Sequence, residues 1–156
     1  MLDPVILLAL TTLVLNDHVL KGVGPAPVTG ILSGLAGLIL MPVVLVAGAE
    51  LFSWARGRSI VPALEPMLAG CLAVGSAYAL VELLPAATEL YRWVWGIVQW
   101  PGSAVIELAG SGSLPAVVPV QAVADPFDLL ALPILAVPVV LQARRASAAS
   151  STFTPA

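Results

Sequence analysis

The amino-acid sequence predicts an all-α integral membrane protein with about four transmembrane helices and one amphipathic helix at the membrane interface. Of its 156 residues, 60% are hydrophobic and only 10% are charged, whereas about 25% of the residues in an ordinary soluble domain are charged. A chain of this composition cannot cover itself with polar surface. Because each crossing helix needs about 20 apolar residues, the length accommodates four crossings and their connections.

The composition also argues against several classes of protein. The formal charge of −3 is small and its residues are spread along the chain, so there is no basic stripe of the kind that binds nucleic acid. The motifs HExxH and GxSxG, the phosphate-binding loop and paired-cysteine metal spacings are all missing. We therefore expect no enzymatic activity, no metal and no cofactor. Lipid or pigment bound at contacts with partner subunits is the one alternative left open.

The first two spans are predicted at residues 4–20 and 28–49. Asp3 followed by Pro4 is a typical helix start, because aspartate caps the first turn and proline is tolerated within it. The second span contains no charged residue, and its Pro42 predicts a kink that neighbouring helices can accommodate. These residues form the clearest apolar helix in the sequence.

The third span is predicted at residues 66–84 and the fourth at 126–143. Each begins with an acidic residue followed by proline, which places a carboxylate near the positive end of the helix dipole. Residues 1–145 are therefore expected to form a single transmembrane domain. The tail, residues 146–156, is rich in Ala, Ser and Thr and has too little apolar surface to order itself, so we expect it to be flexible.

The pattern changes between the third and fourth spans. Residues 86–101 carry several aromatic side chains, and Glu89 and Arg92 stand three positions apart, a spacing that favours an ion pair on a helix. This combination predicts an amphipathic helix at the interface, followed by a loop along the membrane surface over residues 102–124. The aromatic residues expected to anchor the protein at the interface are Trp54, Tyr91, Trp93, Trp95 and Trp100.

The basic residues predict the orientation of the chain. With four crossings, the arginines that follow the second and fourth spans share one side of the membrane, and only Lys21 and Arg92 lie on the other. Cytoplasmic loops carry an excess of Lys and Arg. Both termini are therefore predicted to be cytoplasmic, in the inner membrane of a bacterium.

Seven polar residues from three different helices are expected near the opposite, non-cytoplasmic surface. Ionisable groups at membrane depth are costly and tend to mark functional sites, which favours a proton or ion site. Helix capping and i,i+4 pairing explain the same residues structurally, and a lone histidine without a second His or Cys is a poor metal centre. This polar cluster consists of Asn16, Asp17, His18, Lys21, Glu82, Asp125 and Asp128.

Small residues follow one face of the second span. Small side chains let membrane helices approach closely, and this stripe can pack inside the chain or against another subunit. The predicted helix-packing residues are Gly30, Ser33, Gly34 and Gly37.

Three sequence motifs suggest a relationship to other proteins. Residues 16–21 read NDHVLK, residues 28–38 read VTGILSGLAGL and residues 125–133 read DPFDLLALP. Together they resemble a family of uncharacterised bacterial multi-pass membrane proteins. The second motif of that family reads TGKLSDxxGL, so Ile31 and Gly34 replace its Lys and Asp. The resemblance implies a membrane protein but no reaction, and a function carried by those two charges would be lost in this chain.

These observations favour a non-enzymatic accessory or scaffold subunit. It would pack against a larger bacterial membrane complex, of respiratory or photosynthetic type, with other membrane-protein subunits and lipid as its partners. The alternative is a small transporter, or an ion- or proton-conducting protein, that uses the polar cluster near Asp17, His18 and Glu82. Substitution of Glu82 separates the two hypotheses, because only the second requires this residue for flux.

Overall fold

The computed structural model describes residues 3–20, 23–58 and 63–151, which are mostly helical and include no strand. They form two compact units. Unit 1 combines Met1–Ser76 with Leu130–Ala156, and unit 2 is Ala77–Leu129. The single transmembrane domain over residues 1–145 stays a prediction, and the division into units is not visible in a hydropathy pattern, which does not specify which helices contact one another.

Within the described residues, three helices are long and apolar enough to cross a membrane: Val28–Ala55, Glu65–Leu83 and Pro126–Ala148. They coincide with the second, third and fourth predicted spans. The first predicted span, Pro4–Leu20, is apolar but shorter than these three. The chain is therefore a helical protein with apolar helices that can span a membrane, and a fourth crossing stays a prediction.

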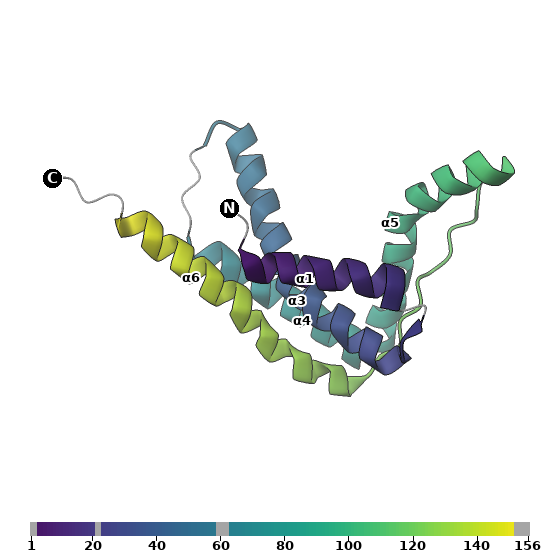
Figure 1. The fold of residues 1–156 in the computed structure, drawn as a ribbon, viewed down its shortest axis with the longest axis horizontal. Helices are drawn as coiled ribbons and strands as arrows, with labels where there is room; N and C mark the ends of the chain where they lie inside the picture. Colours follow the sequence, from purple (N-terminus) through teal and green to yellow (C-terminus); the bar gives the residue numbers. More distant parts are fainter. Residues whose placement is uncertain (1–2, 21–22, 59–62, 152–156) are drawn as a thin grey trace. The chain divides into compact units, whose positions relative to one another are not determined.

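Unit 1 begins with a helical hairpin. α1 (Pro4–Leu15) continues into a π-helical turn, η1 (Asn16–Leu20), and packs beside α3 (Ala26–Ala55), as Figure 1 shows. The Asp3 side chain accepts a hydrogen bond of 2.9 Å from the Val5 amide, which is the predicted cap of the first turn. Apolar side chains of α1 and α3 form one core cluster with Leu141 of α6 (Ala136–Ser151), namely Ile6, Ala9, Leu13, Ile39, Leu40 and Val43.

A second core cluster joins α3 to α4 (Glu65–Leu83) and to η2 (Pro126–Leu135), a 3₁₀ helix. α3 and α4 lie close together beside the buried Pro42 of α3. A Cβ on Gly70 of α4 would lie 3.6 Å from the Pro42 carbonyl oxygen. This is an ordinary van der Waals distance, so α4 packs directly against the proline-containing part of α3 and a small side chain at position 70 would also fit. The cluster consists of Val43, Val46, Met67, Cys71, Leu135 and Val139.

Unit 2 contains α5 (Pro85–Ser111) and an irregular return segment, residues 113–125, which runs back beside the helix (Figure 1). Gly112 ends α5 in the left-handed conformation, with a φ of 73°, which a glycine adopts without steric cost. The Arg92 carbonyl accepts a bond of 3.0 Å from the Val120 amide, and the Arg92 Nε donates one of 3.0 Å to the Val120 carbonyl. This reciprocal pair attaches the return segment to the helix.

Two helices are longer than the sequence predicts. The interfacial helix was predicted to end at Pro101 and to be followed by a loop, but α5 includes Pro101 and continues to Ser111. The tail, residues 146–156, was predicted to be flexible, which stays a prediction, and α6 extends over its first residues to Ser151. Half of the residues that α6 adds, 146–151, are alanine, the best helix former, and residues 152–156 lie outside the described part of the chain.

Candidate functional site

Asn16 is the buried polar residue at the start of the π-helical turn, and its side chain has no exposed surface, at 0%. Its Nδ2 donates hydrogen bonds of 2.7 Å to the Thr29 carbonyl and 2.6 Å to the Ser33 hydroxyl. The Ser33 hydroxyl donates in turn to the Asp17 carboxylate at 3.1 Å. We refer to Asn16, Asp17, Thr29 and Ser33 as the Asn16 site.

The spacing of residues in α3 explains why this site forms. Thr29 and Ser33 are four residues apart, so they lie one above the other on the same face of the helix. Asn16, on the facing helix, therefore reaches the carbonyl of one residue and the hydroxyl of the other. The π-helical turn widens the backbone at the same point, and such turns are rare insertions that often occur at functional sites.

The second polar atom of Asn16 is in an unusual position. Its Oδ1 is buried and has no hydrogen-bond partner among the described residues. Buried side-chain oxygens usually have a partner, since leaving one unpaired costs about 1–3 kcal/mol. The site therefore has an acceptor that a proton donor or a cation would satisfy.

His18 lies in the same turn but makes a separate contact. Its Nδ1 is 3.0 Å from the Val14 carbonyl oxygen, and because a carbonyl only accepts, Nδ1 carries the proton. The ring is exposed. Lys21 of the predicted polar cluster lies outside the described residues. Within the described ranges, no three His, Cys, Asp or Glu side chains are grouped so that they could hold a metal ion.

Two acidic members of the polar cluster in unit 2, Glu82 and Asp125, accept hydrogen bonds from backbone amides. Glu82 is 9% exposed, and its Oε2 accepts a bond of 2.8 Å from the Asp125 amide. The Asp125 carboxylate accepts one of 2.9 Å from the Phe127 amide, and the Asp128 carbonyl accepts one of 3.4 Å from the Tyr78 hydroxyl. Glu82 and Asp125 thus cap the start of η2. Helix capping is the structural explanation that the sequence analysis gave as the alternative to a proton or ion site.

The predicted polar cluster is therefore divided between the two units. Asn16, Asp17 and His18 belong to unit 1, where the first two join the Asn16 site. Glu82 and Asp125 are joined by a hydrogen bond in unit 2. Ser33 belongs to the polar site, although the sequence pattern had assigned it to helix packing, and only its position four residues after Thr29 could have indicated this role.

Two glycines of the predicted packing stripe, Gly30 and Gly37, have open space beside them in the described chain. A Cβ on Gly30 or Gly37 would meet no atom within 4 Å. Gly34, which lies between them in α3, is partly exposed. By contrast, a Cβ on Gly75 of α4 would lie 2.9 Å from the Leu135 side chain. At Gly75 only the flexible end of the Leu135 side chain would have to shift, whereas the α3 stripe is open at Gly30 and Gly37 among the described residues.

The predicted ion pair of α5 is present. Arg92 Nη1 lies 3.0 Å from Glu89 Oε2, and the other oxygen of this carboxylate accepts a bond of 2.9 Å from the Trp93 indole. Because Arg92 also donates to Val120, one side chain connects the polar face of α5 to the return segment. The i,i+3 spacing predicted the ion pair between Glu89 and Arg92 but not the contacts with Trp93 and Val120.

The remaining predicted interface anchors differ in their surroundings. Trp54 is 65% exposed. Tyr91 and Trp95 contact each other edge to face, with ring centroids 6.1 Å apart. Trp100 is half-buried, and its indole nitrogen donates a bond of 2.8 Å to the Pro115 carbonyl. Trp100 therefore serves the contact between α5 and the return segment, a role that its position in an aromatic-rich sequence does not reveal.

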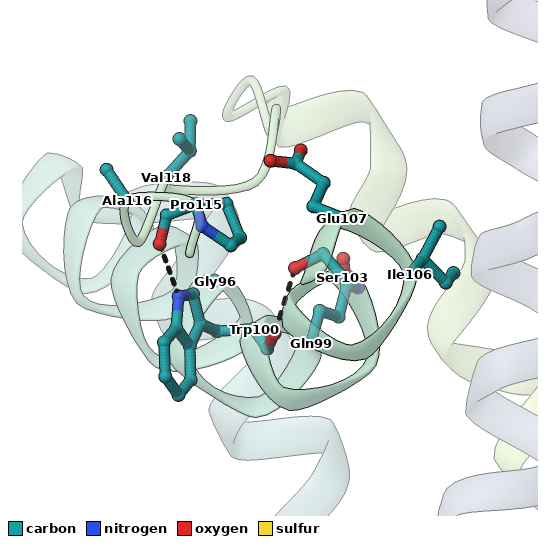
Figure 2. A pocket seen from close by; sticks show the side chains of 9 residues that line it. All are labelled: Gly96, Gln99, Trp100, Ser103, Ile106, Glu107, Pro115, Ala116 and Val118. Atoms are coloured by element: carbon teal, nitrogen blue, oxygen red, sulfur yellow. Dashed lines mark hydrogen bonds between the residues drawn. The ribbon is translucent and has the colours of Figure 1, made fainter. Parts of the chain in front are cut away.

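A pocket of about 370 Å³ lies between α5 and the return segment in unit 2. Figure 2 shows Ser103 and Glu107 on the helix side and Pro115 and Ala116 on the opposite wall. The Ser103 hydroxyl donates a bond of 2.9 Å to the Trp100 carbonyl. The sequence did not predict this pocket, because residues 102–124 were expected to form a loop.

A scan against protein-family models found no match, and searches of curated proteins and of solved structures found no similar chain. The resemblance to a bacterial multi-pass family therefore stays a prediction, and the functional argument rests on the sites described above.

Proposed function

We propose that this chain is a non-enzymatic accessory or scaffold subunit that packs its helices against a larger bacterial membrane complex, of respiratory or photosynthetic type. Its place would be the bacterial inner membrane, with both termini in the cytoplasm. Its partners would be other membrane-protein subunits and lipid, with lipid or pigment held at the contacts between subunits.

The observation that carries this proposal is the open glycine stripe of α3. Gly30 and Gly37 leave room for close approach of a helix, because a Cβ on either residue would meet no atom of another part of the described chain within 4 Å. Only 28% of the most apolar part of this span is buried. Close approach at small residues is how membrane helices associate, so the stripe is suited to a helix of another subunit.

Mild detergent extraction followed by size separation and mass spectrometry tests the proposal. We expect the chain to migrate with a defined complex in fixed stoichiometry. The variant Gly37→Leu should lose this co-migration while the abundance of the chain in the membrane stays unchanged. Gly102→Leu is a matched control, because a Cβ on this α5 glycine also meets no atom within 4 Å. A monodisperse particle that contains this chain alone would contradict the proposal.

The Asn16 site supports a second candidate function, a small transporter or an ion- or proton-conducting protein. Its unpaired buried oxygen, the neighbouring Asp17 carboxylate and the π-helical turn are features of functional sites in membrane helices. The alternative predicted from the sequence also includes His18 and Glu82. Reconstituted vesicles should then show cation or proton flux that Asp17→Asn reduces, and an absence of flux in the parent protein would exclude this candidate.

A further inference from the structure

The two faces of α5 point the opposite way from those of a helix that packs in water. Arg92 and Trp100 hydrogen-bond to the return segment and Gly96 lies against it, so the polar side of the helix is covered (Figure 1). The other side is apolar and exposed. This outer face of α5 consists of Leu90, Val94, Ile97, Val98, Val105 and Leu108. Because a surface helix of a soluble protein turns its apolar side inward, α5 is suited to an apolar environment outside the protein.

The outer face of α5 suits lipid better than another helix. It continues past Pro101, and because Leu90 and Leu108 are 18 positions apart, it is about 27 Å long. Its side chains are all branched and aliphatic. It has none of the small residues that allow a second helix to approach closely, as Gly30 and Gly37 of α3 do.

Aromatic side chains border the outer face on both sides. The helical period places them in two rows along its edges, Tyr91 with Trp95 and Trp93 with Trp100. Tyr and Trp favour the level of the lipid headgroups, because their rings have a polar and an apolar part. Two aromatic edges beside an apolar strip are therefore typical of a helix that lies flat in the membrane interface.

The segment between the second and third candidate spans begins and ends at one place in unit 2. Glu82 Oε2 and the Asp125 amide, 2.8 Å apart, join the end of α4 to the start of η2. Both helices belong to candidate spans. When these two spans cross the membrane, α5 and the return segment leave one surface and come back to it. They either lie along that surface or pass through the membrane and back.

The backbone of the return segment decides between these two arrangements. Residues 114–124 have no regular structure, and among the described residues Val120 is the one position of this stretch whose amide has a backbone acceptor. The bilayer core offers no acceptor, so unpaired amides stay in contact with water. The exposed valines of this segment do not outweigh this, because an unpaired amide in hydrocarbon costs more than a valine in water. The return segment therefore belongs on the aqueous side, and α5 lies along the surface.

We propose that the outer face of α5, from Leu90 to Leu108, is a membrane-insertion surface whose partner is the acyl-chain region of one lipid leaflet. The return segment covers the aqueous side of the helix. This inference deepens the interfacial helix predicted over residues 86–101, because lipid contact continues past Pro101 and α5 neither crosses the membrane nor docks a partner helix. It rests on the chain being a membrane protein and not on the subunit role assigned to α3.

Electrostatic attraction to anionic lipid has no part in this contact. The polar side of α5 carries the carboxylates of Glu89 and Glu107 and the guanidinium of Arg92. It therefore lacks the cluster of basic residues that recognises anionic headgroups. Vesicles of phosphatidylcholine are thus a sufficient membrane for the test.

Spin labels on single cysteines test the proposal in the full chain, reconstituted in these vesicles on a Cys71→Ala background. Val94→Cys and Val105→Cys place the label on the outer face, before and after the proline. Gln99→Cys and Ser103→Cys are the matched controls on the polar side, and all four positions are exposed. Electron paramagnetic resonance measures collisions of the label with O₂, which concentrates in lipid, and with a water-soluble nickel chelate. We expect a higher ratio of O₂ to nickel collisions at positions 94 and 105 than at 99 and 103.

Three results would overturn the proposal. Equal collision ratios at all four positions would show that α5 has no lipid-facing side. Lipid contact at position 94 with water contact at 105 would end the inserted surface at Pro101. Labels at 94 and 105 that neither O₂ nor nickel reaches would assign the outer face to a protein contact.

Hydrogen exchange of the unsubstituted chain in the same vesicles tests the position of the return segment. The amides of residues 116–118 have no backbone acceptor among the described residues, so contact with water predicts rapid exchange. Protection equal to that of α5 would place them in hydrocarbon and overturn the proposal. Co-migration with a complex is measured separately, so failure of the subunit role and failure of lipid insertion are distinguishable.

Discussion

Glu82 illustrates how a single buried acid can have a structural explanation. Asp125 stands directly before η2, where a backbone amide has no acceptor within the helix, so the Asp125 amide is a donor that needs an acceptor elsewhere. Glu82, 43 residues earlier in the chain, supplies that acceptor at 2.8 Å. Glu82, a carboxylate within an apolar span, thus supplies a hydrogen-bond acceptor at the start of another helix, η2.

Substitution of Glu82 should therefore affect stability before function. Glu82→Leu leaves the Asp125 amide without its acceptor and should lower the free energy of unfolding by about 1–3 kcal/mol. Glu82→Gln keeps an oxygen acceptor and should cost less. Chemical unfolding in detergent micelles, followed by circular dichroism, measures both. A Glu82→Gln variant of parental stability that has lost ion flux would instead assign Glu82 to transport.

The side chain of Asn16 shows where sequence reasoning stops at the residue scale. Its position in the NDHVLK segment predicted a polar residue near the end of a helix, and the structure places it there, at the start of η1. Its partners, Thr29 and Ser33, lie beyond a chain reversal and were out of reach. The contacts of Asn16 with these two residues depend on the register between α1 and α3, which a π-helical turn alters by one residue.

Helix starts were the most predictable features at the scale of elements. Asp3, Glu65 and Asp125 each precede a proline, and a helix begins at or beside each pair. Capping is a local interaction, so the residues that determine it are adjacent in the sequence. The end of α5 was not predictable in the same way. Pro101 indicates a break by its missing amide, but a helix can accommodate a proline as a kink when its neighbours favour helix.

The contact between α5 and the return segment depends on Gly96. A Cβ at this position would collide with the Val118 carbonyl oxygen and would lie 3.1 Å from the Pro119 Cα. These are backbone atoms, which cannot move aside as the end of a flexible side chain can. Glycine at position 96 therefore lets the return segment lie directly on the helix.

Gly96→Ala should separate the return segment from α5. We expect faster hydrogen exchange at the Val120 amide, whose bond to the Arg92 carbonyl would lengthen or break. Gly102→Ala is the control on the same helix, because a Cβ there meets no atom within 4 Å. That control should stabilise the helix by about 0.5–1 kcal/mol. Equal exchange at Val120 in both variants would contradict this account of Gly96.

For the whole molecule, the open question is whether α1 and η1 cross the membrane. A crossing needs about 17–25 apolar residues, and Pro4–Leu20 reaches only the lower bound. Three crossings would place the N-terminus on the side opposite the C-terminus. Four crossings would place both on the same side. The arginines at positions 56, 58, 144 and 145 lie on one side in either case, so they predict a cytoplasmic C-terminus under both arrangements.

We predict four crossings, because a surface helix should separate apolar from polar residues on opposite faces, whereas α1 is apolar on all sides. A cysteine placed before Met1 in a Cys71→Ala background should then resist a membrane-impermeant maleimide in intact cells. Ser147→Cys is the control for the cytoplasmic side and should also resist it. Ser113→Cys, in the return segment, should react. Labelling of the N-terminal cysteine at the rate of Ser113→Cys would show that residues 4–20 do not cross the membrane, because three crossings expose the N-terminus on the side of the return segment.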